Sequence, residues 1–116
     1  MEPLQYRRPR RLADLEAHIA YLPTDGGGRS AGVCSGYRAI HDFGLTGELH
    51  DAQHEYPERR WVDPGTDAIA LLWLLAPEAQ RGRFYSGMKF TVQDGAKVVG
   101  HGEVMTVLNK ELARDA

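Results

Sequence analysis

The side chains best suited to metal chemistry lie in the short stretch HDAQHE. It holds His50 and His54 four positions apart, with Asp51 and Glu55 beside them. On a helix this spacing would bring two imidazoles to one metal ion, with a carboxylate to assist. The surrounding sequence from 51 to 60 is polar, and the HExxH order of zinc proteases is absent. We therefore predict a solvated loop here and no metal site.

Cys34 and His41 form a second candidate pair, as a thiolate nucleophile and its base. They are seven positions apart, and an odd spacing along a strand places side chains on opposite faces of a sheet. Free cysteine is also among the most buried residue types. We predict a buried structural cysteine, a protein that is not an enzyme, and no cofactor, since the phosphate-loop pattern GxxxxGK[ST] is also missing.

Arginines and aromatic residues remain as candidates for binding. Arg29 in GGR and Arg38 in GYR are glycine-flanked and lie nine positions apart. Aromatic side chains mixed with basic ones are typical of surfaces that bind proteins or RNA. Trp73, in contrast, lies within an apolar run and is predicted to be core. The predicted partner-binding surface consists of Arg29, Tyr37, Arg38, Trp61, Arg83, Phe84 and Tyr85.

Length and composition indicate one small domain. The chain has 116 residues, a net charge of −2 and one cysteine, which excludes an internal disulfide. With no apolar leader, we expect a cytoplasmic protein. The longest apolar run, AIALLWLLA, is far shorter than the ~20 residues that cross a bilayer, so we expect no membrane partner. Four arginines nevertheless cluster near the N-terminus: Arg7, Arg8, Arg10 and Arg11.

The elements that must position these residues are strands. Alternating apolar residues, separated by glycine and proline turn signals, indicate extended segments. These segments are 14–22, 37–50 (broken at Gly44 and Gly47, where a further short strand begins), 68–75, 88–93 and 97–108. Periodicity alone also permits a short helix at 68–75. Asp94-Gly95 predicts a tight hairpin. The pattern favours an all-β sandwich or small barrel over 14–108, after a basic extended arm (1–13) and before a polar tail (109–116).

The order of several motifs resembles the C-terminal, third domain of translation elongation factor Tu. The motifs are GGR and GYR between Gly27 and Arg38, Leu45-Thr46-Gly47, the Pro64-Gly65 turn, the strand 87–92, and Asp94-Gly95 followed by VVGHGEV and VL. Together they cover roughly 14–108. This resemblance implies a small six-stranded antiparallel β-barrel.

The resemblance also bears on RNA. The family's GTPase domain and middle barrel have no counterpart in this sequence, so we expect no GTP binding. In the family this barrel touches tRNA and the exchange factor, and Thr46, Asp94 and Gly95 match tRNA-facing positions. Gln93 replaces the arginine found there, which removes a charge-assisted phosphate contact. An RNA surface would therefore combine Arg7, Arg8, Arg10, Arg11, Thr46, Asp94, Gly95 and Lys97.

Three functions are compatible with these patterns. The first is a non-catalytic protein-binding module that imitates the elongation factor barrel, as an immunity or decoy protein occupying a toxin's docking surface would. The second is an accessory tRNA- or RNA-binding protein of translation. The third, an enzyme, has no set of residues to support it. We expect the first, with a toxin or a translation-related protein as the partner and tRNA binding weak at best.

Overall fold

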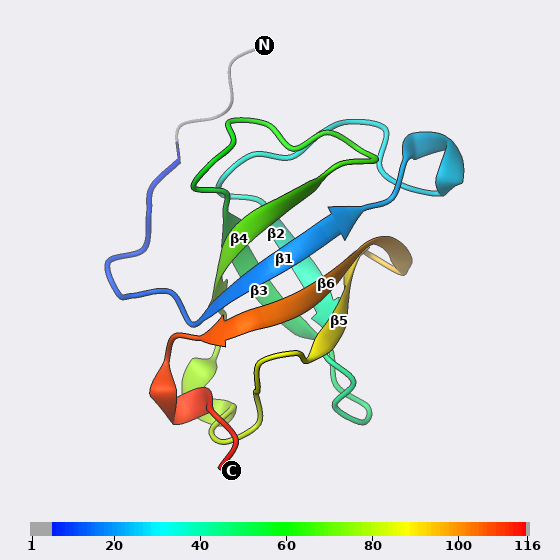
Figure 1. Ribbon diagram of the computed structural model, residues 1–116. Helices are drawn as coiled ribbons and strands as arrows, with labels where there is room; N and C mark the ends of the chain where they lie inside the picture. The colour runs from blue at the N-terminus through cyan, green and yellow to red at the C-terminus, as the bar shows by residue number, and fades with distance from the viewer. Residues whose placement is uncertain (1–5, 116) are drawn as a thin grey trace.

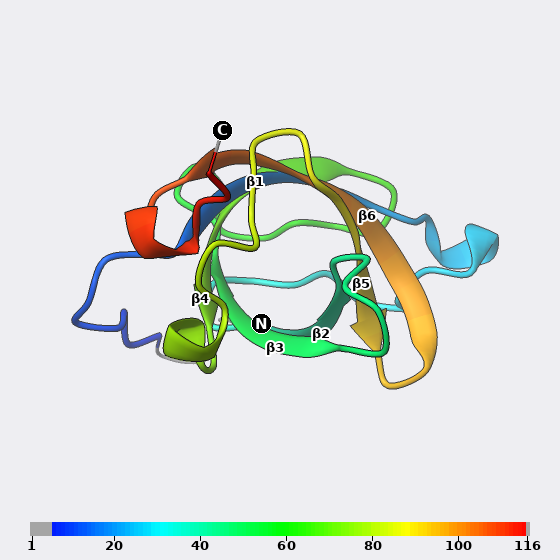
Figure 2. The ribbon, with the colours of Figure 1, turned by 90° about the horizontal axis from the view of Figure 1, so that it is seen from below.

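Six antiparallel strands close into a small barrel. The computed structural model describes residues 6–115, and Figure 2 looks into the ring of strands. The strands, shown in Figure 1, are β1 (Leu15–Tyr21), β2 (Arg38–Asp42), β3 (His50–Glu55), β4 (Asp67–Leu74), β5 (Lys89–Asp94) and β6 (Lys97–Val107). They follow one another around the barrel as β1-β4-β3-β2-β5-β6. Two single-turn 3-10 helices, η1 (Thr24–Gly26) and η2 (Pro77–Ala79), lie in connections between strands, and a third, η3 (Lys110–Leu112), follows β6. The predicted all-β barrel is confirmed.

Local patterns explain most of these strands. In β1 every second residue, from Leu15 to Tyr21, is buried as predicted. Segment 68–75 is the strand β4 and not a helix. The Asp94-Gly95 hairpin is confirmed, since Asp94 pairs with Lys97 and Gly95 has a φ of 58°. Such a backbone angle is favourable for glycine, which lacks a Cβ atom.

The predicted loop at 51–60 is wrong over its first half, which forms most of β3. This strand lies between β2 and β4 and pairs with both. Its outward side chains, such as Asp51 and Gln53, are polar. Its inward side chain His54 is fully buried but is also a polar residue type. The strand has little apolar alternation for this reason, and only its neighbours in space identify it.

Gly102 provides the space into which an aromatic ring of the core packs. A Cβ atom at this position would lie 2.2 Å from Cζ of Phe90, which is 4% exposed. Phe90 and Gly102 are direct partners across β5 and β6. The sequence predicts that Gly100 and Gly102 allow a bend or bulge within β6. The β5–β6 register does shift beside Gly100, because Val92 pairs with Gly100 whereas Gln93 pairs with Val98, which leaves Val99 as the extra residue.

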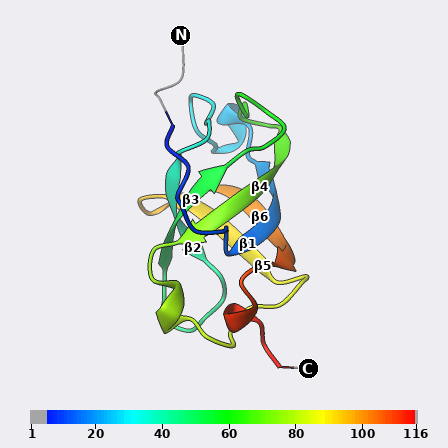
Figure 3. The same cartoon turned by 90° about the vertical axis from the view of Figure 1, so that its left-hand side faces the viewer.

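The basic arm is packed against the barrel. In Figure 3 it runs, in dark blue, across the face formed by β3 and β4. It covers the outer side of Trp73, which is 4% exposed and whose indole Nε1 donates to the Arg11 carbonyl at 2.9 Å. The Arg8 guanidinium lies 5.7 Å from the centre of the same ring. Trp73 is thus buried as predicted, but on the outside of the barrel.

A fully buried carboxylate joins the arm, the barrel and the tail. Asp14 accepts hydrogen bonds from Arg11 at 2.7 Å, from the backbone N–H of Leu74 at 2.7 Å and from the Asn109 amide at 2.9 Å. The predicted polar tail also contributes to the core, because Leu112 is 0% exposed. Both ends of the described chain are therefore part of the folded domain.

Candidate functional site

Two histidines and two tyrosines form a hydrogen-bonded chain inside the barrel. Nε2 of His41 and Nε2 of His54 lie 2.7 Å apart. Nδ1 of His54 lies 2.8 Å from the Tyr56 hydroxyl, which lies 2.6 Å from that of Tyr21. Both imidazoles are 0% exposed, so neither is placed to reach a substrate. The chain spans strands β1, β2 and β3 and the residue after β3.

The partners determine where each proton lies. Nδ1 of His41 is 3.1 Å from the His50 carbonyl oxygen, which only accepts, so this nitrogen carries hydrogen. Nε2 of His41 is then an acceptor, and His54 must donate to it from its own Nε2. Nδ1 of His54 is left to accept from Tyr56, whose oxygen in turn accepts from Tyr21. One arrangement of protons thus satisfies the whole chain.

Burial keeps all four of these groups uncharged at neutral pH. It lowers the pKa of His41 to about 4, against the opposing effects of backbone hydrogen bonds and the Asp51 charge. Burial, helped by the neighbouring His41, lowers the pKa of His54 well below its usual value. Burial also raises the pKa of Tyr21 and of Tyr56. The chain is therefore a neutral polar element of the core, and sequence reasoning missed it.

Three predicted site residues meet at one rim of the barrel. Asp94 accepts a hydrogen bond from Arg29 and another from the Tyr37 hydroxyl at 2.6 Å. The Arg29 guanidinium lies 5.1 Å from the centre of the Tyr37 ring. The same ring contacts His54, with 5.3 Å between the two ring centres. Burial and the hydrogen bond to Asp94 raise the pKa of Tyr37. These groups satisfy one another, so the rim is preordered but offers little free charge.

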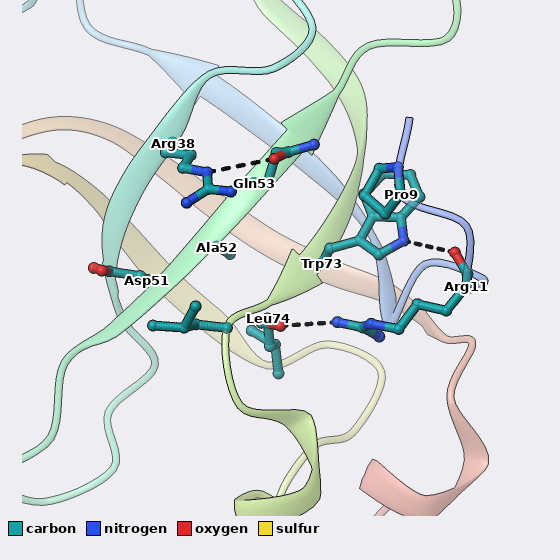
Figure 4. A pocket seen from close by; sticks show the side chains of 9 residues that line it. Pro9, Arg11, Arg38, Asp51, Ala52, Gln53, Trp73 and Leu74 are labelled. Atoms are coloured by element: carbon teal, nitrogen blue, oxygen red, sulfur yellow. Dashed lines mark hydrogen bonds between the residues drawn. The ribbon is translucent and has the colours of Figure 1, made fainter. Parts of the chain in front are cut away.

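A groove lies between the arm and the outer face of β2, β3 and β4 (Figure 4). It holds about 210 Å³ and is open to solvent. Its apolar lining comes from Pro9, Ala52, Trp73, Leu74 and Leu75, and its polar lining from Arg11, Arg38, Asp51 and Gln53. Figure 4 shows Pro9 over the Trp73 ring, with Arg11 and Arg38 on opposite sides. The groove is large enough for one partner side chain.

Arg38 is the exposed cation of this groove. The sequence left two roles open for Arg38: pairing with a carboxylate to hold a loop in place, or binding a partner. Its side chain points outward from β2 and makes one long hydrogen bond, of 3.4 Å, from Nε to the Gln53 amide. We find no ion pair of Arg38 with any of residues 6–115. A structural role for its charge is therefore not supported.

A second shallow groove begins on the other side of Arg38. It holds about 280 Å³ and extends over Ile40 and Gln93 to Asp94 and Gly95. Arg38 and Asp51 line both grooves. The two hollows thus form one path across the outer face, with these two charged side chains at its middle.

The remaining predicted contact residues lie apart from this path. Phe84 is 0% exposed and packs edge-on against Phe43, so its predicted place on a contact surface is wrong. Phe84 follows the charged stretch Arg81-Gly82-Arg83, and its core partner Phe43 is distant in the sequence, so no local pattern marks it as buried. Arg83 binds Glu48 through two hydrogen bonds of 2.9 and 2.7 Å, and Tyr85, 39% exposed, packs under Arg114. Trp61 is half-buried.

Half of the eight residues predicted for RNA, including Asp94 at the rim, are engaged within the chain. Arg8 pairs with Glu55, and Arg11 pairs with Asp14 and bonds the Leu74 carbonyl. Lys97 donates to the Gly28 carbonyl at 2.9 Å. The others predicted, Arg7, Arg10, Thr46 and Gly95, are exposed.

Metal-binding groups are not brought together in the part of the chain that the structure describes. Cys34 is free and half-buried, where full burial was expected. Within residues 6–115 no three His, Cys, Asp or Glu side chains are close enough to hold one metal ion. In the same range no helix is long and apolar enough to cross a membrane. No protein-family model matches the chain.

Proposed function

We propose that this chain is a non-catalytic protein-binding module that uses the outer face of β2 and β3. The observation that carries the proposal is Arg38, an exposed guanidinium with no carboxylate partner among the described residues, beside a groove with an apolar lining. Arginine next to buried aromatic and aliphatic side chains is the common composition of binding hot spots. A charge with no role in folding is available for a partner.

We also propose that the barrel imitates the C-terminal barrel of elongation factor Tu in the cytoplasm. Two observations support this. The strands close into the expected kind of barrel, and the GGR, GYR and Asp-Gly motifs meet at one rim through Arg29, Tyr37 and Asp94. A domain of this shape could occupy a toxin's docking surface as a decoy or immunity protein, or could bind a translation-related protein.

RNA binding is the second candidate, and the observation that favours it is the exposure of Arg7 and Arg10 on the arm. Neither forms an ion pair with any described residue. Phosphate binding depends on free cations. Because Arg8, Arg11, Arg29 and Lys97 already have acceptors within the chain, this surface has fewer available charges than the sequence indicates.

The experiment is affinity purification from the native cytosol with RNase treatment, followed by reconstitution with the purified partner. Arg38→Ala should weaken the complex, whereas Arg81→Ala, which removes an exposed arginine bound to Glu111 elsewhere, should leave it unchanged. Capture that is lost after RNase and insensitive to Arg38→Ala would replace this proposal with the RNA one.

A further inference from the structure

We propose that the groove beside Arg38 binds an internal, extended segment of the partner protein in which an aliphatic side chain lies near a glutamate or aspartate. This inference rests on the proposed function and names the chemistry of its partner. It follows from the closed sheet, the apolar lining of the groove, and the distribution of charge along its path.

The closed barrel determines how a partner can bind. Extended peptides commonly join an exposed sheet edge through backbone hydrogen bonds. Here each of the six strands pairs with two neighbours, so the barrel has no edge strand, although β2 pairs with β5 only over 40–42. A partner must therefore be recognised through side chains on the outer face, and the groove is where that face is hollowed.

The apolar part of the groove fits an aliphatic side chain. The outward-facing Trp73 is almost fully buried, at 4% exposed, and forms the floor together with Pro9, whereas the side chain of Leu74 belongs to the barrel core. Leu75 at the margin is 72% exposed, which is unusual for a side chain that lines a groove. A partner side chain seated on this floor would cover Leu75 and remove apolar surface from water.

The charged part of the groove fits one carboxylate. Of its two arginines, Arg11 is already bound to Asp14 and to the Leu74 carbonyl. Arg38 has both terminal nitrogens unpaired among residues 6–115. The planar guanidinium matches a carboxylate in a two-pronged contact. An acidic side chain of the partner would complete it.

The negative charge of Asp51 favours a protein segment over a polyphosphate chain as the ligand of this groove. It lines both hollows with Arg38, so successive phosphates following the path would meet a negative charge. A protein segment instead brings backbone N–H groups, which can donate hydrogen bonds to the Asp51 carboxylate. Because the path continues past Arg38 toward Gly95, an internal segment can run through, and a chain terminus is not required.

The probes are capped octapeptides of serine and glycine that carry one leucine and one glutamate, with the two residues placed one to four positions apart. Binding is followed by NMR on the full chain, through the indole N–H of Trp73 and the Nε–H of Arg38. The indole N–H of Trp61, which does not line the groove, is the internal control. Matched peptides replace glutamate with glutamine, leucine with serine, or end in a free carboxylate without glutamate; a single-stranded RNA is tested in parallel.

We expect at least one Leu–Glu peptide to shift both groove signals in a saturable way while the Trp61 signal stays fixed. Its affinity should fall by about tenfold in Arg38→Gln or when glutamate becomes glutamine, the size expected for one charge-assisted contact. Arg7→Gln, which changes an exposed arm arginine outside the groove, should leave the affinity unchanged.

Three results would overturn the inference: no peptide shifts the groove signals, the glutamine peptide binds equally well, or the free-carboxylate peptide or the RNA binds better. If this happens while the native complex still depends on Arg38, the protein-binding function stands and only the partner chemistry is wrong. If the native complex is also insensitive to Arg38, both proposals fail.

Discussion

The inner and outer faces of β2 and β3 differ in how completely their polar groups are paired. On the inner face, His41 and His54 each use both ring nitrogens in hydrogen bonds. The exception is His50 at the start of β3, whose buried Nε2 has, among the described residues, only the Glu48 carboxylate nearby, at 3.3 Å. On the outer face of the same strands, Arg38 and Asp51 have no ion pair within residues 6–115. A buried polar group without a partner costs stability, whereas an exposed charge is solvated by water. The polar groups of the inner face therefore contribute to the stability of the fold, whereas the charged groups of the outer face are available to bind a partner.

The largest effect should come from removing an inner histidine. His54→Ala leaves a cavity and removes the partner of both His41 and Tyr56, so the free energy of unfolding should fall by about 3–5 kcal/mol. His101→Ala, on the exposed side of β6, should change it by less than about 0.5 kcal/mol. Urea denaturation monitored by circular dichroism measures both. Similar losses in the two variants would contradict the contrast between faces.

The second largest effect should be a fall in the free energy of unfolding at acid pH, caused by the buried histidines of the inner face. The pKa of buried His41 is lowered to about 4, and the pKa of His54 is also lowered well below its usual value, so the unfolded chain binds protons first as pH falls below about 6.5. Stability is therefore fully present above that pH and is lost as pH falls toward the folded-state pKa values.

Each differentially bound proton should cost about 1.4 kcal/mol per pH unit. Urea unfolding at a series of pH values between about 7 and 5, where most carboxylates remain ionised, measures the slope. His101→Gln is the control and should leave it unchanged. A free energy of unfolding that stays constant or rises on acidification would rule out two neutral buried histidines.

Tyr37 lies at the rim of the barrel, and changing it should lower the free energy of unfolding by an intermediate amount. Tyr37→Phe keeps the ring against His54 but removes the hydroxyl that donates to Asp94, for an expected loss of about 1–2 kcal/mol. Tyr85→Phe is the matched control, because that ring is exposed and contacts Arg114 through its face. Thermal or urea unfolding of the pair tests this. Equal stability of both variants would show that the rim cluster adds nothing to the fold.

The smallest effect on stability should come from the outer face. Arg38→Ala removes an exposed side chain with one long hydrogen bond, so the free energy of unfolding should change by less than about 0.5 kcal/mol. Partner affinity, measured on the reconstituted complex by calorimetry, should nevertheless fall. A clear loss of stability with unchanged affinity would assign Arg38 to the scaffold and remove the difference between the faces.

Part of the candidate site could be predicted from the sequence. Glycine flanks and aromatic neighbours indicated Arg29, Tyr37 and Arg38 as a group, and all three lie at one rim or on the adjoining strand β2. The groove could not be predicted, because its walls come from the arm, β2, β3 and the end of β4. The hydrogen-bond partner of Arg38 could not be predicted either, because Gln53 comes to lie opposite it only through the pairing of β2 with β3.

The sequence by itself determined the features that depend on near neighbours. Alternation over a few residues determined β1, β5 and β6, and Asp94-Gly95 determined the last hairpin, because strand periodicity and turn geometry are local properties. Only the tertiary structure decided that His54 is core, that Phe84 and Leu112 are buried, and that Arg38 is unpaired. Histidine is polar in any local pattern, and His54 is accommodated in the interior because the β2–β3 pairing brings His41 close enough to accept a hydrogen bond from it.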